Sequence, residues 1–217
     1  MTTRQLTWSA LALWCAAVLG LGAAGAFVGP PEQPPLAIVA GATLPLAIFA
    51  AAYRRSRAFR EFVLSADLRL VTALQAWRWA GLGFLALWAH RVLPGLFAGV
   101  AGLGDMAVGF AAPWIVLGLA REPAFAGTRR FALFNWLGIL DLTVALSLGG
   151  LSSMIMRNNV TMAPMAQMPL VLIPAFMVPL FLMLHITALL QARDHVRVPD
   201  AAKMGAARTV VREAPLT

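Results

Sequence analysis

Apolar residues recur in long runs along most of the chain, and short polar or proline-containing segments interrupt them. Runs of about 20 residues suffice to cross the roughly 30 Å hydrocarbon core of a bilayer as an α-helix. The pattern predicts an all-α fold: a polytopic transmembrane bundle of six helices in one domain, residues 1–191, with a polar tail, 192–217, that we expect to be disordered. The predicted spans are 8–28, 36–53, 70–90, 96–120, 131–149 and 169–191.

Basic residues concentrate in the connections on one side of the predicted bundle. If the N-terminus lies inside, the outer side receives only Arg91 and Arg157. The inner side receives Arg4, Arg54, Arg55, Arg57, Arg60, Arg69, Arg121, Arg129, Arg130 and the five basic residues of the tail. Because cytoplasmic loops carry the excess of Lys and Arg, we expect both termini in the cytoplasm of a bacterial cell, with the helices in its inner membrane.

Composition supports this class of protein and excludes others. Hydrophobic residues make up 60% of the chain and charged residues 12%, whereas about a quarter of a soluble domain is charged. The net charge of +8 does not predict nucleic-acid binding, because the basic residues lie in the connections between spans. The expected partner is the lipid bilayer. The lone Cys15 excludes an intramolecular disulfide and a cysteine-based metal site.

Three charged residues fall inside predicted spans: Arg78, Asp105 and Asp141. Each lies roughly 13–15 Å along its helix at 1.5 Å per residue, near the middle of the membrane. Charges at this depth are costly and usually functional. These three residues are therefore the predicted centre of the protein.

Polar and small residues around the charges repeat at three- and four-residue spacing, which places them on one face of each helix. These stripes are Gln75, Arg78, Gly81; Gly99, Gly102, Asp105, Gly109; and Asn135, Gly138, Asp141. Small residues allow close helix packing and polar ones form hydrogen bonds across it. We expect the three stripes to face one another, with Gln75 and Asn135 lining the centre. The glycine-rich faces could instead join two copies of the chain in a homo-oligomer.

The charge balance of this centre indicates proton exchange. One arginine cannot neutralise two aspartates, so the surplus carboxylate can take up and release a proton, as a proton-linked transporter or channel for an ion or small solute requires. His185, roughly 24 Å along the sixth span, is at the depth of Asn135 and could relay protons from the cytoplasm. The alternative is a non-catalytic membrane scaffold, with a structural ion pair and a hydrogen-bonded histidine.

Pro174 and Pro179 lie inside the sixth span. They remove backbone donors and free carbonyl groups, which can make a helix discontinuous, as at transporter binding sites.

The sequence Gly102-Leu103-Gly104-Asp105 resembles the GxGD signature of intramembrane aspartyl proteases, which activate water with two aspartates. In that family the partner aspartate precedes the signature and a Pro-Ala-Leu motif follows it. Here Asp141 comes afterwards and no Pro-Ala-Leu follows. We expect no catalytic residues, and keep an intramembrane aspartyl hydrolase as the enzymatic alternative.

The predicted outer loop is rich in methionine, whose thioether suits Cu(I). Five methionines fall within this short region: Met154, Met156, Met162, Met165 and Met168. Methionine is also a flexible hydrophobe that can dip into the membrane interface. We expect no cofactor, with Cu(I) bound at this loop as the alternative; the histidines at 90 and 185 differ too much in depth to share a haem iron.

Several strings together resemble a family of small bacterial six-helix integral membrane proteins with no assigned activity. They are Gln75-Ala-Trp-Arg78, Gly102-Leu-Gly-Asp105, Ala112-Pro113 and the stretch from Asn135 to Leu142. The resemblance spans the third to fifth predicted helices. It implies that the stripes form a unit and implies no function.

Overall fold

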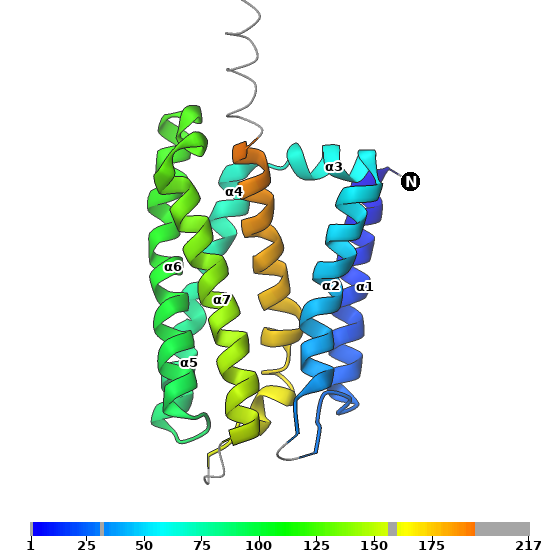
Figure 1. Ribbon diagram of the computed structural model, residues 1–217, viewed down its shortest axis with the longest axis vertical. Coiled ribbons are helices and arrows are strands. Elements are labelled where there is room, and N and C mark those ends of the chain that lie inside the picture. Colours follow the sequence, from blue (N-terminus) through cyan, green and yellow to red (C-terminus); the bar gives the residue numbers. More distant parts are fainter. Residues whose placement is uncertain (1, 31–32, 156–159, 194–217) are drawn as a thin grey trace, which may run out of the picture.

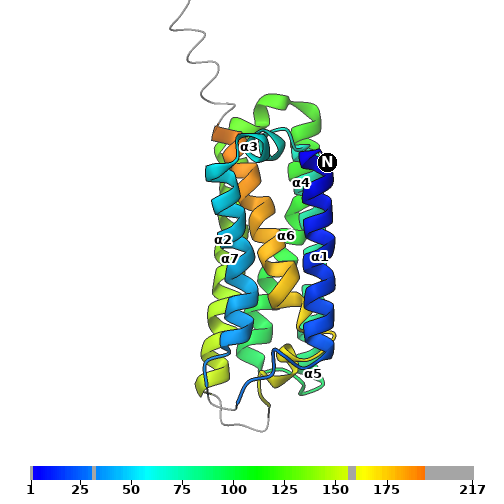
Figure 2. The same cartoon turned by 90° about the vertical axis from the view of Figure 1, so that its right-hand side faces the viewer.

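The computed structural model describes residues 2–30, 33–155 and 160–193. The regular elements in these ranges are all helical, and six helices are long and apolar enough to cross a membrane, which confirms the predicted fold class. Their long axes run side by side (Figures 1 and 2). The spans are Thr3–Ala23, Leu36–Arg55, Leu68–Ala89, Gly95–Arg121, Arg129–Met154 and Ile173–Arg193.

The third and sixth spans are each composed of more than one kind of helix. The third consists of α4, η1 and α5, in which η1 is a 3₁₀ helix, and the sixth begins with a π-helical turn, η4. The elements are α1 (Thr3–Ala23), α2 (Leu36–Arg55), α3 (Arg57–Leu64), α4 (Leu68–Ala73), η1 (Leu74–Gly81), α5 (Leu82–Ala89), α6 (Gly95–Arg121), η2 (Pro123–Gly127), α7 (Arg129–Ile155), η3 (Ala163–Ala166) and η4 (Ile173–Met177).

The sixth span lies in the middle of the bundle (Figure 1). On one side it meets α7, where Phe181 and Leu182 pack with Leu142. On its other side, buried residues near its start pack with α1, as Val171 does with Val18. The third span, α6 and α7 form a tight group, so the first two helices join the bundle mainly through the sixth span and α3.

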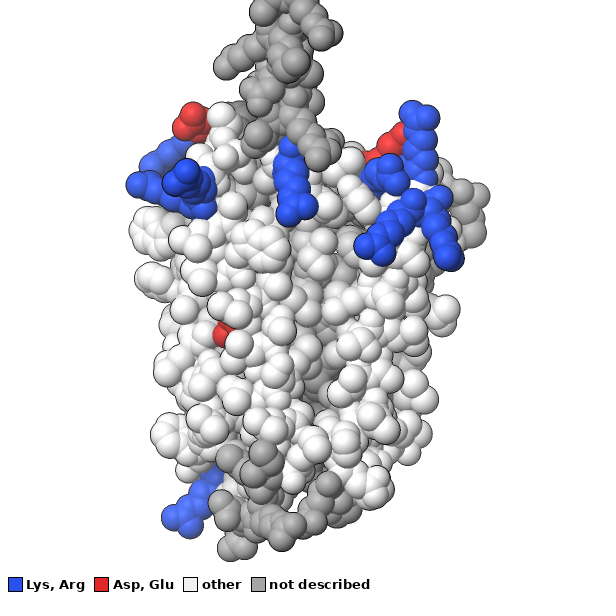
Figure 3. Space-filling view, viewed as in Figure 1, with Lys and Arg blue, Asp and Glu red and all other residues white. Residues whose placement is uncertain are grey.

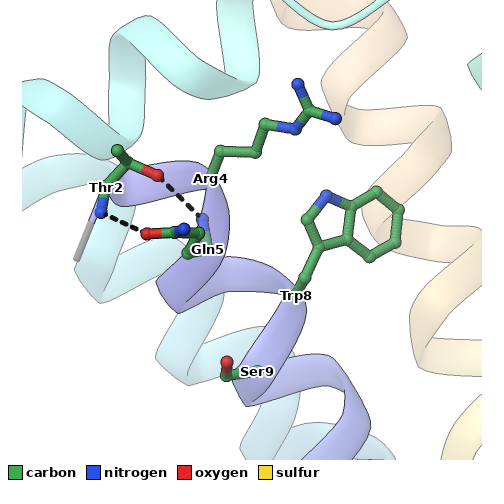
Figure 4. A pocket seen from close by; sticks show the side chains of 5 residues that line it. All are labelled: Thr2, Arg4, Gln5, Trp8 and Ser9. Atoms are coloured by element: carbon green, nitrogen blue, oxygen red, sulfur yellow. Dashed lines mark hydrogen bonds between the residues drawn. The ribbon is translucent and has the colours of Figure 1, made fainter.

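The first helix begins and ends about five residues earlier than predicted, because its caps rather than its apolar run set its limits. Thr2 and Gln5 form a capping box: the Gln5 amide donates to Thr2 Oγ1 at 3.3 Å, and the Thr2 amide donates to Gln5 Oε1 at 3.0 Å (Figure 4). Arg4 and Trp8 extend together from the same turn (Figure 4). The chain leaves the helix at Gly25, where φ is +71° and glycine avoids the strain of a side chain.

The last two spans also differ from the predicted limits. The helix α7 continues to Ile155, beyond the predicted end at 149, and regular helix resumes at 173 rather than 169. The sixth span then continues through Pro174 and Pro179 without a break. Its π-helical turn, in which the Val178 amide donates to the Ile173 carbonyl, accommodates the first proline.

Charge divides the bundle into two ends. Basic side chains gather at the end where α1 begins and α3 lies across the helices, here called the basic end (Figure 3). Among the described residues, Arg91 is the basic residue of the opposite end, in the turn between α5 and α6. The sixth span continues to Arg193, two residues into the predicted tail of 192–217, and the rest of that tail lies outside the described residues.

Gln191 joins the sixth span to the end of α3 and the turn after it by hydrogen bonds at the basic end. Its Nε2 donates to the carbonyl of Val63, in the last turn of α3, and to that of Ala66, between α3 and α4, both at 2.9 Å. We expect Gln191→Leu to lower the free energy of unfolding by about 1–3 kcal/mol, because one buried and one partly buried carbonyl lose this donor. Thermal unfolding of the purified protein in detergent tests this, with Gln167→Leu at an exposed glutamine as the matched control. Equal melting of both variants would contradict it.

Candidate functional site

The three charged residues of the spans meet in one cluster near the middle of the bundle. Arg78 lies on η1, Asp105 on α6 and Asp141 on α7. The Arg78 Nε donates to Asp105 Oδ1 at 2.7 Å, and its Nη2 donates to Asp141 Oδ2. One guanidinium therefore binds carboxylates from two different helices, in the arrangement that the stripes predicted.

The two aspartates are less buried than the arginine between them. The Arg78 side chain is 1% exposed, whereas those of Asp105 and Asp141 are 18% and 14% exposed. Figure 3 shows an acidic spot at mid-height of an otherwise uncharged wall, far from the basic residues of either end. The guanidinium is thus enclosed by the bundle, while its carboxylate partners reach the surface of the helices.

The 3₁₀ conformation of η1 explains how Arg78 is aimed at this centre. With three residues per turn, side chains three apart lie directly above one another. Gln75, Arg78 and Gly81 form such a row and are buried, while Trp77 and Trp79 on the other faces are 66% and 51% exposed. The row faces the interior of the bundle, towards α6, α7 and the sixth span, and the tryptophans face outward.

Glycines bring the backbones around the charges into contact. A Cβ at Gly102 would lie 2.9 Å from the Gly81 carbonyl oxygen, and one at Gly109 would lie 2.5 Å from the Trp79 nitrogen. A Cβ at Gly104 would overlap the Asp141 carboxylate. The stripe residues Gly102 and Gly109, and Gly104 outside the stripe, therefore serve packing within one chain, whereas the stripe residue Gly99 has open space around it. A homo-oligomer stays a prediction.

This geometry gives the Gly102-Leu103-Gly104-Asp105 sequence a packing role. Gly102 admits the third span, Gly104 admits the Asp141 carboxylate, and Asp105 binds the arginine. The guanidinium of Arg78 lies between the two carboxylates and binds both. In a hydrolytic aspartate pair the two carboxylates instead share one proton, so the structure offers no specific support for the hydrolase alternative.

His185 joins the centre from the sixth span and is fully buried. Its Nε2 lies 3.2 Å from Arg78 Nη1, which also approaches the Gly138 carbonyl at 3.5 Å. Because a guanidinium only donates, Nε2 must accept, so the ring proton is on Nδ1. That nitrogen then donates to Asn135 Oδ1 at 2.9 Å. In this arrangement His185 is neutral, and its protonation requires Arg78 Nη1 to move away.

The two predicted amide residues occupy different positions relative to the charges. Asn135 is held by the Phe131 carbonyl, to which its Nδ2 donates at 2.9 Å, and it meets the centre through His185. Gln75 lies one 3₁₀ turn from Arg78, and its Nε2 donates to the Phe181 carbonyl at 3.3 Å. Gln75 therefore borders the centre and binds none of its charged groups by a described hydrogen bond.

Thr72 is a buried polar residue near the centre that sequence reasoning missed. It is 2% exposed and lies on α4, three residues before Gln75 and nearer the basic end. Extending the three-residue spacing of the stripe backwards from Gln75 would have found it.

The methionines of the predicted metal loop are distributed over different environments. Met162 and Met165 are buried in an apolar cluster with Phe84, Leu93 and Phe97. Met154 and Met168 are exposed, and Met156 lies outside the described residues. In the described part of the chain no group of three or more His, Cys, Asp or Glu could hold a metal ion. Copper binding at the thioethers stays a prediction.

Fold and centre together define a class: an all-helical protein with six apolar spans around a buried arginine and two aspartates. The chain belongs to a family described as a domain of unknown function (DUF8737), whose model matches residues 34–193. The match contains every residue of the centre and agrees with the resemblance to a family without an assigned activity. No curated protein and no solved structure matched the chain.

Proposed function

We propose that this is a multi-pass protein of the bacterial inner membrane that moves protons in step with an ion or small solute. The observation that carries the proposal is the single guanidinium of Arg78 held between Asp105 and Asp141, near the middle of three spans. Ionisable groups at this depth are expensive, and they commonly mark ion or proton paths.

The charge balance supports a proton carrier. With both aspartates ionised the centre has a net charge of −1, so one bound proton neutralises it. Asp105 binds the Nε edge of the guanidinium and Asp141 binds Nη2. Protonation of one carboxylate therefore weakens its own bond to the guanidinium and leaves the bond to the other carboxylate intact. The freed N–H groups can then bind an anionic group of a solute.

The lower burial of the carboxylates supports their role as the exchanging groups. Both aspartates are less enclosed than Arg78, so a carboxylate can change its protonation state while the arginine stays within the bundle. The wall of the bundle at this depth would face lipid, so the proton needs a polar path to reach the carboxylate. By the excess of Lys and Arg on cytoplasmic sides, the basic end would face the cytoplasm, with both termini on that side.

Proteoliposomes with an internal pH dye test the proposal. We impose a membrane potential and repeat the measurement with each of a panel of added ions. We expect the wild-type protein to carry a proton flux with at least one of them. Asp105→Asn or Asp141→Asn should reduce it to the rate of protein-free liposomes, because an amide cannot carry the proton. Thr143→Val, at an exposed position of α7 two residues from Asp141, is the matched control and should keep the flux.

A second candidate is a membrane scaffold in which the ion pair is structural. The engagement of all three guanidinium nitrogens of Arg78 by partners favours it. It predicts no wild-type flux with any ion, together with lower melting temperatures of the Asp→Asn variants. That combination would replace the transport proposal with the scaffold.

A further inference from the structure

Two buried polar atoms beside the centre have no hydrogen-bond partner among the residues that the structure describes. They are Thr72 Oγ1 and Gln75 Oε1, on side chains that are 2% and 1% exposed. Leaving a buried polar atom unsatisfied costs about 1–3 kcal/mol, so such atoms in native proteins are ordinarily bound by water. Gln75 cannot swing away to find another partner without breaking its bond to the Phe181 carbonyl.

The two atoms belong to the row that ends at Arg78. Thr72 on α4, and then Gln75 and Arg78 on η1, follow one another at three-residue spacing. Water molecules with hydrogen bonds of about 2.8 Å can link polar groups on successive helical turns. Thr72 is only about 6 Å from the start of α4 at the basic end, so a short file of water suffices to reach it.

Beyond Arg78, towards the opposite end of the bundle, the residues at the same three-residue spacing are apolar. Gly81 follows, and then Phe84, which is 6% exposed and meets Phe97 edge to face at 5.5 Å. Around them Met162 and Met165 complete a closed apolar cluster. Polar side chains thus border the centre towards the basic end, and hydrophobic ones border it towards the opposite end.

We propose that Thr72 and Gln75 hold a short file of water that connects the basic end with Arg78 and His185, so that the centre exchanges protons with that side. The inference builds on the proposed function by adding its access route. The groups that face this route are Arg78 on η1 and His185 on the sixth span, with Asp105 of α6 and Asp141 of α7 beyond the guanidinium.

Cysteine reactivity tests the water file without any measurement of transport. A thiol reacts with methyl methanethiosulfonate as its thiolate, which forms only where water is present. In a Cys15→Ala background we compare Thr72→Cys with Ala101→Cys, which is equally buried in the apolar cluster of the opposite side. Leu74→Cys, on an exposed face of η1, controls for reagent dissolved in lipid or detergent.

We expect Thr72→Cys to react on the order of tenfold faster than both controls, as followed by intact-protein mass spectrometry. Gln75→Cys provides the same test if the first variant does not fold. Rates at 72 and 75 no faster than at 101 would overturn the water file even if proton flux is present. Fast reaction without flux would support the file and count against the transport proposal alone.

Discussion

Replacing Arg78 with methionine is expected to lower the free energy of unfolding by about 3–5 kcal/mol. The side chain is 1% exposed and is the described cation that binds Asp105 and Asp141, so its removal leaves two carboxylates near the middle of the spans without a counter-charge. Unfolding of the purified protein by increasing SDS in mixed micelles, followed by tryptophan fluorescence or circular dichroism, measures the change.

The triple variant Arg78→Met, Asp105→Asn, Asp141→Asn is the control for this result. Replacing a whole buried ionic group is often nearly neutral, whereas removing one partner is costly. The triple variant should therefore regain most of the stability that the single variant loses. A single variant as stable as the wild type would show that the aspartates do not depend on the arginine for their burial.

Gly138→Ala is also expected to be damaging, with a loss of about 1–3 kcal/mol in the free energy of unfolding. A Cβ at this position would overlap the His185 ring, whose Cδ2 would be 2.9 Å away. The ring must shift and break its contacts with Arg78 and Asn135. The same unfolding assay in mixed micelles applies.

Gly83→Ala is the matched control, because nothing lies within 4 Å of a Cβ at that helical position. It should be neutral or slightly stabilising, since alanine favours helix over glycine. Combining Gly138→Ala with His185→Ala should cost less than the sum of the single changes, because the overlap disappears with the ring. Additive losses would mean that Gly138 acts through something other than His185.

The sequence was sufficient for the class of fold and for the residues of the centre. Long apolar runs located all six spans, because a bilayer requires length and hydrophobicity above all else. Three- and four-residue spacing selected Arg78, Asp105 and Asp141, which the structure brings together. Helical rise placed His185 at the depth of Asn135, and the two form a hydrogen bond. Their function stays a proposal.

Details that depend on contacts between helices could not be predicted. The 3₁₀ form of η1 is linked to its close approach to α6 at Gly102 and Gly109, and no local property of the residues 74–81 specifies it. The hydrogen bond from Gln75 to Phe181 joins residues over a hundred positions apart. The start of α1 depends on a capping box, which a pattern of hydrophobic residues does not reveal.

The 3₁₀ segment also relates the centre to the thickness of the surrounding membrane. Eight residues extend about 16 Å as a 3₁₀ helix and about 12 Å as an α-helix, so η1 lengthens the third span by about 4 Å. Membranes differ in thickness by a few ångströms, and a span that is too long or too short pays for the mismatch. A thinner bilayer therefore favours shortening of η1, which would rotate Gln75 and Arg78 relative to each other. The relative orientation of these two side chains therefore depends on membrane thickness through the conformation of residues 74–81.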